Sequence, residues 1–130
     1  MRRVKGETMD SKAIDREQWI AFANQFSRAH EGWTASLEIR EAGSPMRVEV
    51  DESPFRGVTV EEREGRDTLV LTFGYEPEEH FAHIIHDPHA IAAAETGDRT
   101  GASLVVDSSD SSRCILALWN PMREEDFAAV

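Results

Sequence analysis

A chain of 130 residues is long enough for one domain with its own hydrophobic core, and its single cysteine, Cys114, excludes an intramolecular disulfide. The formal net charge of −11 disfavours binding to nucleic acid or to an anionic membrane surface, and it favours either a basic partner or solubility alone. No apolar run approaches the ~18 residues of a membrane span and the N-terminus shows no secretory signal, so we expect a cytoplasmic protein.

We expect a single domain from residue 14 to residue 119, because no repeat, linker or low-complexity run divides that stretch. Residues 1–13 are polar and without periodicity, which predicts a disordered lead-in. Residues 120–130 are expected to form a C-terminal tail, either frayed or in a short helix.

The first regular element is a helix, predicted from Asp15 to Glu31. Asp15, followed by Gln18, is typical of an N-cap, and Gly32 stands where a left-handed glycine commonly ends a helix. One face of the predicted helix carries an apolar stripe whose residues recur at helical spacing: Trp19, Phe22, Ala23, Phe26 and His30. The stripe contains three aromatic rings, which must be shielded from water, and we expect the strands that follow to cover them.

From residue 33 onward the apolar pattern changes to a period of two, which is typical of strands with one face in water. Residues 90–96 also have helical propensity, but their short length and their surroundings favour a strand. Turn-forming residues occupy the stretches 41–45, 52–57, 64–67 and 96–101. We therefore expect eight short strands at residues 33–40, 46–51, 58–61, 69–73, 80–86, 90–96, 102–107 and 113–119.

No helix lies between consecutive strands, so parallel pairing through crossover helices is not expected. The sequence predicts an α+β fold, in which one N-terminal helix packs on a curved, mainly antiparallel β-meander of about eight strands that is barrel-like. The alternative is a two-layer α/β sandwich with an open antiparallel sheet.

Four of the five histidines, His80, His83, His86 and His89, follow one another at a constant spacing. Imidazole is a common ligand of transition metals, so these four residues are candidates for a metal site. On a strand, however, His80 and His86 share one face about 20 Å apart at ~3.3 Å per residue, and His83 points to the other face. We therefore predict no cofactor, with a divalent transition metal held near a bend at residues 87–88 as the alternative.

His30 and His83 are candidates for acid–base catalysis, because both lie on stripes that face the interior and could flank one pocket. Tyr75 or an upstream glutamate would be the partner group. The simpler interpretation is that His30 is favoured by the helix C-terminus and that His83 is a hydrogen-bonded core residue. Cys114 has no motif histidine beside it in the sequence and is expected to be an inert core residue.

Three stretches, IDREQW, FSRAHEGW and YEPEEHFAH, carry a family resemblance. Together they resemble an uncharacterised bacterial family of unknown function, whose helix ends in FSRxHEGW and whose later segment reads EPxEHxxH. The resemblance extends from about residue 14 to residue 119 and implies no activity. The matching positions are Trp19, Phe26, Ser27, His30, Glu31, Gly32, Trp33, Glu76, Pro77, Glu79, His80 and His83.

The HEGW sequence at 30–33 is also interpreted as a structural joint, in which Gly32 turns the chain and Trp33 packs back on the helix. We predict a non-enzymatic domain that binds a small molecule or a protein, and a homodimer is compatible with this role. The alternatives are an acidic interaction protein that regulates a basic partner, and a histidine-based enzyme or metal-binding protein. The candidates for ligand binding are His30, Glu31, Trp33, Tyr75, Glu79, His80 and His83.

Overall fold

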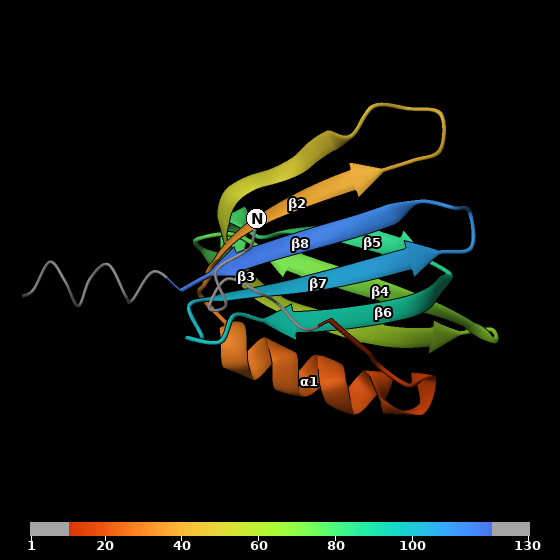
Figure 1. Cartoon of the computed structure of the whole chain (residues 1–130), viewed down its shortest axis with the longest axis horizontal. Coiled ribbons are helices and arrows are strands. Elements are labelled where there is room, and N and C mark those ends of the chain that lie inside the picture. Colours follow the sequence, from red (N-terminus) through yellow and green to blue (C-terminus); the bar gives the residue numbers. More distant parts are fainter. Residues whose placement is uncertain (1–10, 121–130) are drawn as a thin grey trace, which may run out of the picture.

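The computed structural model describes residues 11–120, and it shows one helix packed against one antiparallel sheet of eight strands (Figure 1). The helix α1 spans Trp19–His30, and two 3-10 turns, η2 and η3, span Arg16–Gln18 and Pro77–Glu79. The strands are β1 (Lys12–Ala13), β2 (Thr34–Arg40), β3 (Arg47–Arg63), β4 (Arg66–Phe73), β5 (Phe81–His86), β6 (Pro88–Glu95), β7 (Gly101–Ser108) and β8 (Arg113–Trp119).

The strands are arranged in the order β1-β6-β7-β8-β2-β3-β4-β5, and all neighbours are antiparallel. The sheet curves so far that His83 on β5 reaches Cys114 on β8, although three strands separate them in this order. Its outermost strands, β1 and β5, do not pair with each other, so the sheet is not closed within the described residues. The predicted α+β fold, with one helix on a curved antiparallel sheet, is confirmed.

The structure corrects the prediction of a turn at residues 52–57, because residues 47–63 form one strand of 17 residues, β3. Its first part, around Val50, pairs with β2, and its second part, around Val58, pairs with β4. Glu52, with a φ of 55°, lies inside the pairing with β2, at the register shift between Val50 and Ser53, and it interrupts the extended backbone there. The turn-forming residues therefore bend the strand without ending it, since each part obtains main-chain hydrogen bonds from a different neighbour.

The other turns that separate strands follow the prediction more closely. Glu64 and Gly65 both have positive φ, 55° and 77°, and form the two-residue hairpin turn between β3 and β4. Asp87, with a φ of 56°, ends β5 immediately before β6 begins at Pro88. Residues 90–96, which also have helical propensity, lie mostly in strand β6 as predicted.

The helix begins later than predicted and without the predicted N-cap. The Asp15 side chain makes no capping hydrogen bond, and its backbone carbonyl instead accepts from the Gln18 N–H at 2.8 Å. Residues 16–18 thus form a tighter 3-10 turn, and α1 starts at Trp19. The other end agrees with the prediction, because Gly32 takes a left-handed φ of 88° just after the helix.

The structure also changes the assignment of the residues before the helix. Lys12 and Ala13 belong to the stretch predicted to be disordered, but they form β1 and pair with β6. The remainder of that stretch, residues 1–10, and the predicted tail at 121–130 lie outside the described residues. Within residues 11–120, the only α-helix is too short to cross a membrane.

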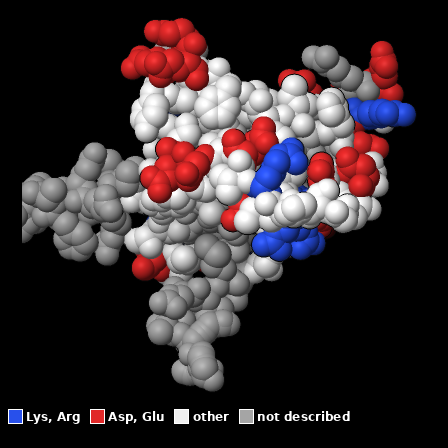
Figure 2. Space-filling view, turned by 90° about the horizontal axis from the view of Figure 1, so that it is seen from above, with Lys and Arg blue, Asp and Glu red and all other residues white. Residues whose placement is uncertain are grey.

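Charged side chains lie on the outside of the domain. In the view from above, Asp and Glu stand in several separate groups, whereas Lys and Arg lie near the middle and at one corner (Figure 2). Among the described residues, the buried polar side chains are those of His30 and Ser108. The interior is therefore formed almost entirely by apolar groups, as the hydrophobic effect requires.

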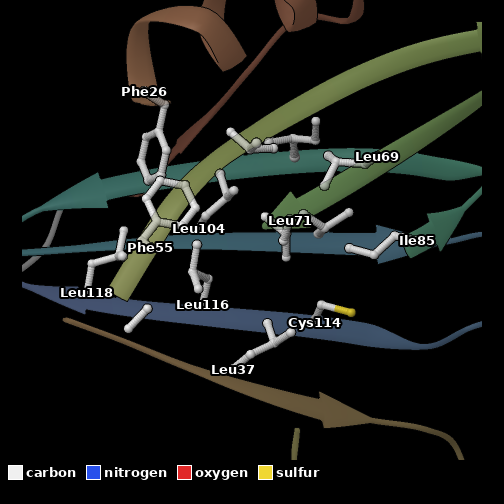
Figure 3. Close-up of a cluster of buried hydrophobic side chains, with 14 of the residues drawn as sticks. Phe26, Leu37, Phe55, Leu69, Leu71, Ile85, Leu104, Cys114, Leu116 and Leu118 are labelled. Atoms are coloured by element: carbon white, nitrogen blue, oxygen red, sulfur yellow. The ribbon is translucent and has the colours of Figure 1, made fainter. Parts of the chain in front are cut away.

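The predicted apolar stripe of the helix is buried against the sheet. Trp19, Ala23 and Phe26 are at most 5% exposed, and Phe22 is partly buried. Phe26 packs edge-on against Phe55 of β3, with 5.9 Å between the ring centroids. Figure 3 shows side chains from several strands of the curved sheet pointing into the same core. The prediction that strands cover the aromatic face of the helix is confirmed.

Candidate functional site

His30 is a packed residue at the end of α1 that makes two polar contacts. Its Nδ1–H donates to the carbonyl of Phe26 at 2.8 Å, and its Nε2 lies 3.4 Å from a carboxylate oxygen of Glu95. The hollow that His30 lines is separate from the hollow that His83 lines. The sequence indicated that His30 and His83 could flank one pocket, but in the structure they line two separate hollows.

The turn after the helix is fastened to β3 by main-chain hydrogen bonds. The N–H of Gly32 donates to Phe55 O at 2.7 Å, and the N–H of Phe55 donates to Trp33 O at 2.8 Å. The Trp33 ring packs edge-on against His30, with 4.6 Å between the ring centroids. These contacts give the HEGW sequence a structural role as the joint between the helix and the sheet.

Arg56 connects this joint to the acidic segment that precedes β5. Its Nε donates to Gly74 O at 2.7 Å and its Nη2 donates to Tyr75 O at 2.8 Å. Its Nη1 lies 3.9 Å from a carboxylate oxygen of Glu31. Two motifs that are far apart in the sequence are therefore held together by a residue that belongs to neither of them.

Most of the other candidate residues face solvent. Tyr75, Glu79 and His80 are exposed, and so are His86 and His89. In the part of the chain that the structure describes, no three His, Cys, Asp or Glu side chains come together as a group that could hold a metal ion. The four regularly spaced histidines are thus not gathered around a common point.

His83 lies between a thiol and a carboxylate. Its Nε2 is 3.8 Å from Sγ of Cys114 on β8, and its Nδ1 is 3.9 Å from Oε2 of Glu49 on β3. Neither of these two strands pairs with β5, so the group forms only because the sheet curves. Cys114 therefore does have a histidine neighbour, in space rather than in the sequence.

Burial determines the protonation of this group. Loss of hydration raises the pKa of the Cys114 thiol to about 11. Loss of hydration also lowers the pKa of His83, against the opposing effect of the Glu49 carboxylate. At neutral pH the pair is a thiol beside a neutral imidazole, and not the thiolate–imidazolium pair that cysteine nucleophiles use.

A hollow of about 160 Å³ lies next to His83, between β5 and the ends of the β2–β3 and β7–β8 hairpins. Ile84 and His86 of β5 form one side of its lining. Across from them stand two carboxylates, those of Glu41 and Asp110, and the guanidinium of Arg47. The hollow therefore borders the edge of the sheet and is lined mainly by polar groups.

In the sheet formed by residues 11–120, β5 is the last strand and pairs only with β4. The N–H of Asp87 donates at 3.0 Å to the carbonyl of Asp67, and these two residues lie opposite each other as the next pair in the β4–β5 register. Hydrogen-bonded pairs alternate along an antiparallel ladder, so the main-chain groups of Ala82, Ile84 and His86 turn away from β4. The edge of β5 thus presents peptide groups that no strand of the described residues satisfies.

The family model of DUF5335, described as a family of unknown function, matches residues 10–127. The chain belongs to DUF5335. No curated protein and no solved structure matches it. The resemblance to an uncharacterised family is confirmed, and the membership brings no activity with it.

In this DUF5335 chain, Ser27 of the FSRAHEGW stretch has a role that the sequence did not reveal. Its hydroxyl accepts a hydrogen bond from Val58 N–H at 2.8 Å and donates one to Val58 O at 3.1 Å. A Cβ on the neighbouring Gly57 would lie 3.3 Å from the Ser27 oxygen. The helix therefore approaches β3 closely at this point, and Ser27 satisfies the strand in place of a main-chain partner.

Proposed function

We propose that this protein is a non-enzymatic binding domain that accepts an extended segment of another protein as an additional strand beside β5. The observation that carries the proposal is the outer edge of β5, where the main-chain groups of Ala82, Ile84 and His86 have no strand partner among the described residues. Strand addition satisfies such groups with intermolecular hydrogen bonds, and side-chain pockets beside the edge supply specificity.

The composition of β5 supports this proposal. Edge strands are commonly protected from pairing by lysine, proline or very short length. β5 consists of FAHIIH, without lysine or proline, and Phe81 and Ile84 are 45% and 49% exposed. At the opposite end of the sheet, β1 has only two residues and one of them is Lys12. The two edges therefore differ, and β5 is the one suited to pairing.

The His83–Cys114 group supports a non-enzymatic role. A nucleophilic cysteine is normally accessible and has a lowered pKa, because the thiolate is the reactive form. Cys114 is 4% exposed, and burial raises its pKa to about 11. The group is better explained as part of the wall beside the β5 edge than as a catalytic pair.

The proposal can be tested with isotope-labelled protein and a short synthetic peptide of alternating valine and threonine, blocked at both ends. We expect titration with this peptide to shift the amide NMR signals of Ala82, Ile84 and His86 first, because these groups would form the new hydrogen bonds. Signals from α1, which packs mainly on β3, should remain in place.

Two matched variants sharpen this test. Ile84→Lys places a protective charge on the edge and should abolish the shifts. Ile20→Lys makes the same change on the exposed face of α1, where Ile20 is 62% exposed, and should leave them unchanged. The proposal is wrong if neither this peptide nor a second peptide of alternating valine and lysine shifts the signals of β5, or if the two variants respond alike.

A further inference from the structure

We infer that the segment added to β5 is basic, and that carboxylates beside the edge recognise its lysine or arginine side chains. This inference rests on the proposed function and adds the chemistry of the partner. It starts from the hollow along the edge, which Ile84 and His86 line on one side and the carboxylates of Glu41 and Asp110 line on the other. A side chain that leaves the added strand towards these carboxylates would meet negative charge.

Among the described residues, Arg47 supplies the one guanidinium in the lining of the hollow, and this guanidinium is already paired with carboxylates. Arg47 Nη1 lies 3.5 Å from a carboxylate oxygen of Glu41, and its Nε lies 3.3 Å from a carboxylate oxygen of Glu49. His83 adds no positive charge at neutral pH, because burial lowers its pKa. The charges beside the edge therefore sum to a negative value, with two glutamates sharing one arginine.

Asp110 is the carboxylate that remains available to a partner. It accepts hydrogen bonds from the hydroxyl of Ser112 at 2.6 Å and from the N–H of Ser112 at 3.0 Å. These bonds lower the pKa of Asp110, so the carboxylate is ionised at neutral pH. Both bonds come from uncharged groups, and within residues 11–120 no cationic side chain is recorded at hydrogen-bond distance from Asp110, so its carboxylate could accept an incoming ammonium or guanidinium.

Strand geometry then determines the sequence pattern of the partner. Side chains of a strand alternate between two faces, so a residue of the added strand beside Ile84 would share its outer, exposed face. The residues before and after it would point to the side of His83 and Glu49. The expected partner is therefore an extended segment in which apolar and basic residues alternate.

A second copy of this chain suits the same edge less well. Each copy carries a formal net charge of −11, and pairing β5 with itself would bring the two sets of carboxylates together. The acidic groups that stand around the surface in Figure 2 would add to this repulsion. Charge complementarity thus favours a basic segment over self-association.

The inference is tested by fluorescence anisotropy with three labelled peptides of equal length. Valine alternates with lysine in the first, with threonine in the second and with glutamate in the third. We expect the lysine peptide to bind about tenfold or more tightly than the threonine peptide at low salt, and the glutamate peptide to bind weakest. The preference for lysine should shrink at high salt, because the contacts are at the surface.

A pair of double variants locates the charges responsible. Glu41→Gln/Asp110→Asn removes the carboxylates beside the edge and should reduce the preference for lysine to about twofold or less. Glu17→Gln/Glu62→Gln removes the same net charge from a separate hollow beside α1 and should preserve the preference. Equal effects of the two double variants would overturn the assignment of the recognition to Glu41 and Asp110.

The remaining outcomes separate this inference from the proposed function. Equal binding of the lysine and threonine peptides would overturn the basic partner and leave strand addition intact. Failure of all three peptides would overturn both. A dimer in light scattering that Ile84→Lys disrupts and Ile20→Lys does not would show that a second copy occupies the edge, and it would overturn the inference.

Discussion

The Sγ atom of Cys114 and the Nε2 atom of His83 lie 3.8 Å apart because the curved sheet brings β5 over β8. The contact sits at the rim of the core, where Ile85 and Leu116 are also buried (Figure 3). Water is largely excluded there, so the charged forms of both groups are disfavoured. This relationship leads to predictions about reactivity and about the dependence of stability on pH.

The first prediction concerns the reactivity of Cys114. Burial raises the pKa of its thiol from 9.0 to about 11, which reduces the thiolate fraction near pH 8 about 100-fold. We expect iodoacetamide to modify the folded protein at least that much more slowly than the same protein in concentrated urea. Mass spectrometry of timed samples measures both rates. Similar rates in the two conditions would show that the thiol is accessible and normally acidic.

The second prediction concerns stability at alkaline pH. A thiol whose pKa is raised by folding stabilises the folded state fully below pH 9, and this contribution is lost as the pH rises towards 11. The loss should be on the order of 2 kcal/mol in the free energy of unfolding for a shift of this size. Urea denaturation of the wild type at pH 8 and pH 10.5 measures it. Cys114→Ala lacks the group and should show a smaller decrease over the same range.

The third prediction concerns the titration of His83. Burial lowers its pKa below 6.5, the Glu49 carboxylate opposes this shift, and the Arg47 guanidinium adds to it. Glu49→Gln should therefore lower the pKa of His83 further, and Arg47→Gln should raise it. An NMR titration of the imidazole carbon-bound protons provides the measurement, with the urea-unfolded protein as reference. A midpoint that does not move in either variant would contradict the assigned contacts.

The helix and most strands could be predicted because their signals are local. The spacing of Trp19, Phe22 and Phe26 depends only on helix geometry, and alternation along a strand depends only on the pleat. The long strand β3 was predicted as two strands, because the residues around Glu52 favour turns. Whether such residues end a strand or bend it depends on the neighbours that pair with each part, and those neighbours are distant in the sequence.

The candidate site was predicted only in part, and for the same reason. The sequence singled out His83, but its neighbours Cys114 and Glu49 come from β8 and β3, and only the curvature of the sheet brings them together. The open edge of β5 was equally hidden, because the order of strands in a sheet is a long-range property. His30 was correctly placed on the buried stripe, whereas its contact with Glu95 was not foreseen.

The fourth prediction tests the packing of the helix on the sheet. Phe26→Ala should reduce the free energy of unfolding by about 3–5 kcal/mol, because a buried ring that packs on Phe55 is replaced by a cavity. Phe26→Leu keeps part of the volume of the side chain and should reduce the free energy of unfolding by a smaller amount. This variant provides the measurement if the alanine variant does not fold. Ile20→Ala, on the exposed face of the same helix, should change stability by about 0.5 kcal/mol or less. Urea denaturation of all three variants provides the comparison, and equal losses for Phe26→Ala and Ile20→Ala would contradict the docking of this face.

The fifth prediction concerns Gly74, where the chain leaves β4 for the acidic segment. Its φ is 134°, and a Cβ there would lie 2.7 Å from the backbone oxygen of Glu79 and 2.9 Å from Cα of His80. Gly74→Ala should therefore cost about 2 kcal/mol or more in the free energy of unfolding, because both the backbone and the segment would have to move.

Gly97→Ala is the matched control for this change. Apart from its two chain neighbours, no atom of the described residues lies within 4 Å of a Cβ at Gly97, and its φ is not in the left-handed region, so this substitution should be neutral within about 0.5 kcal/mol. Because the segment from Gly74 to His80 leads directly into β5, Gly74→Ala should also weaken peptide binding at that edge, and Gly97→Ala should not. Urea midpoints and peptide anisotropy give the two readouts, and an unchanged urea midpoint in Gly74→Ala would show that the turn tolerates a side chain.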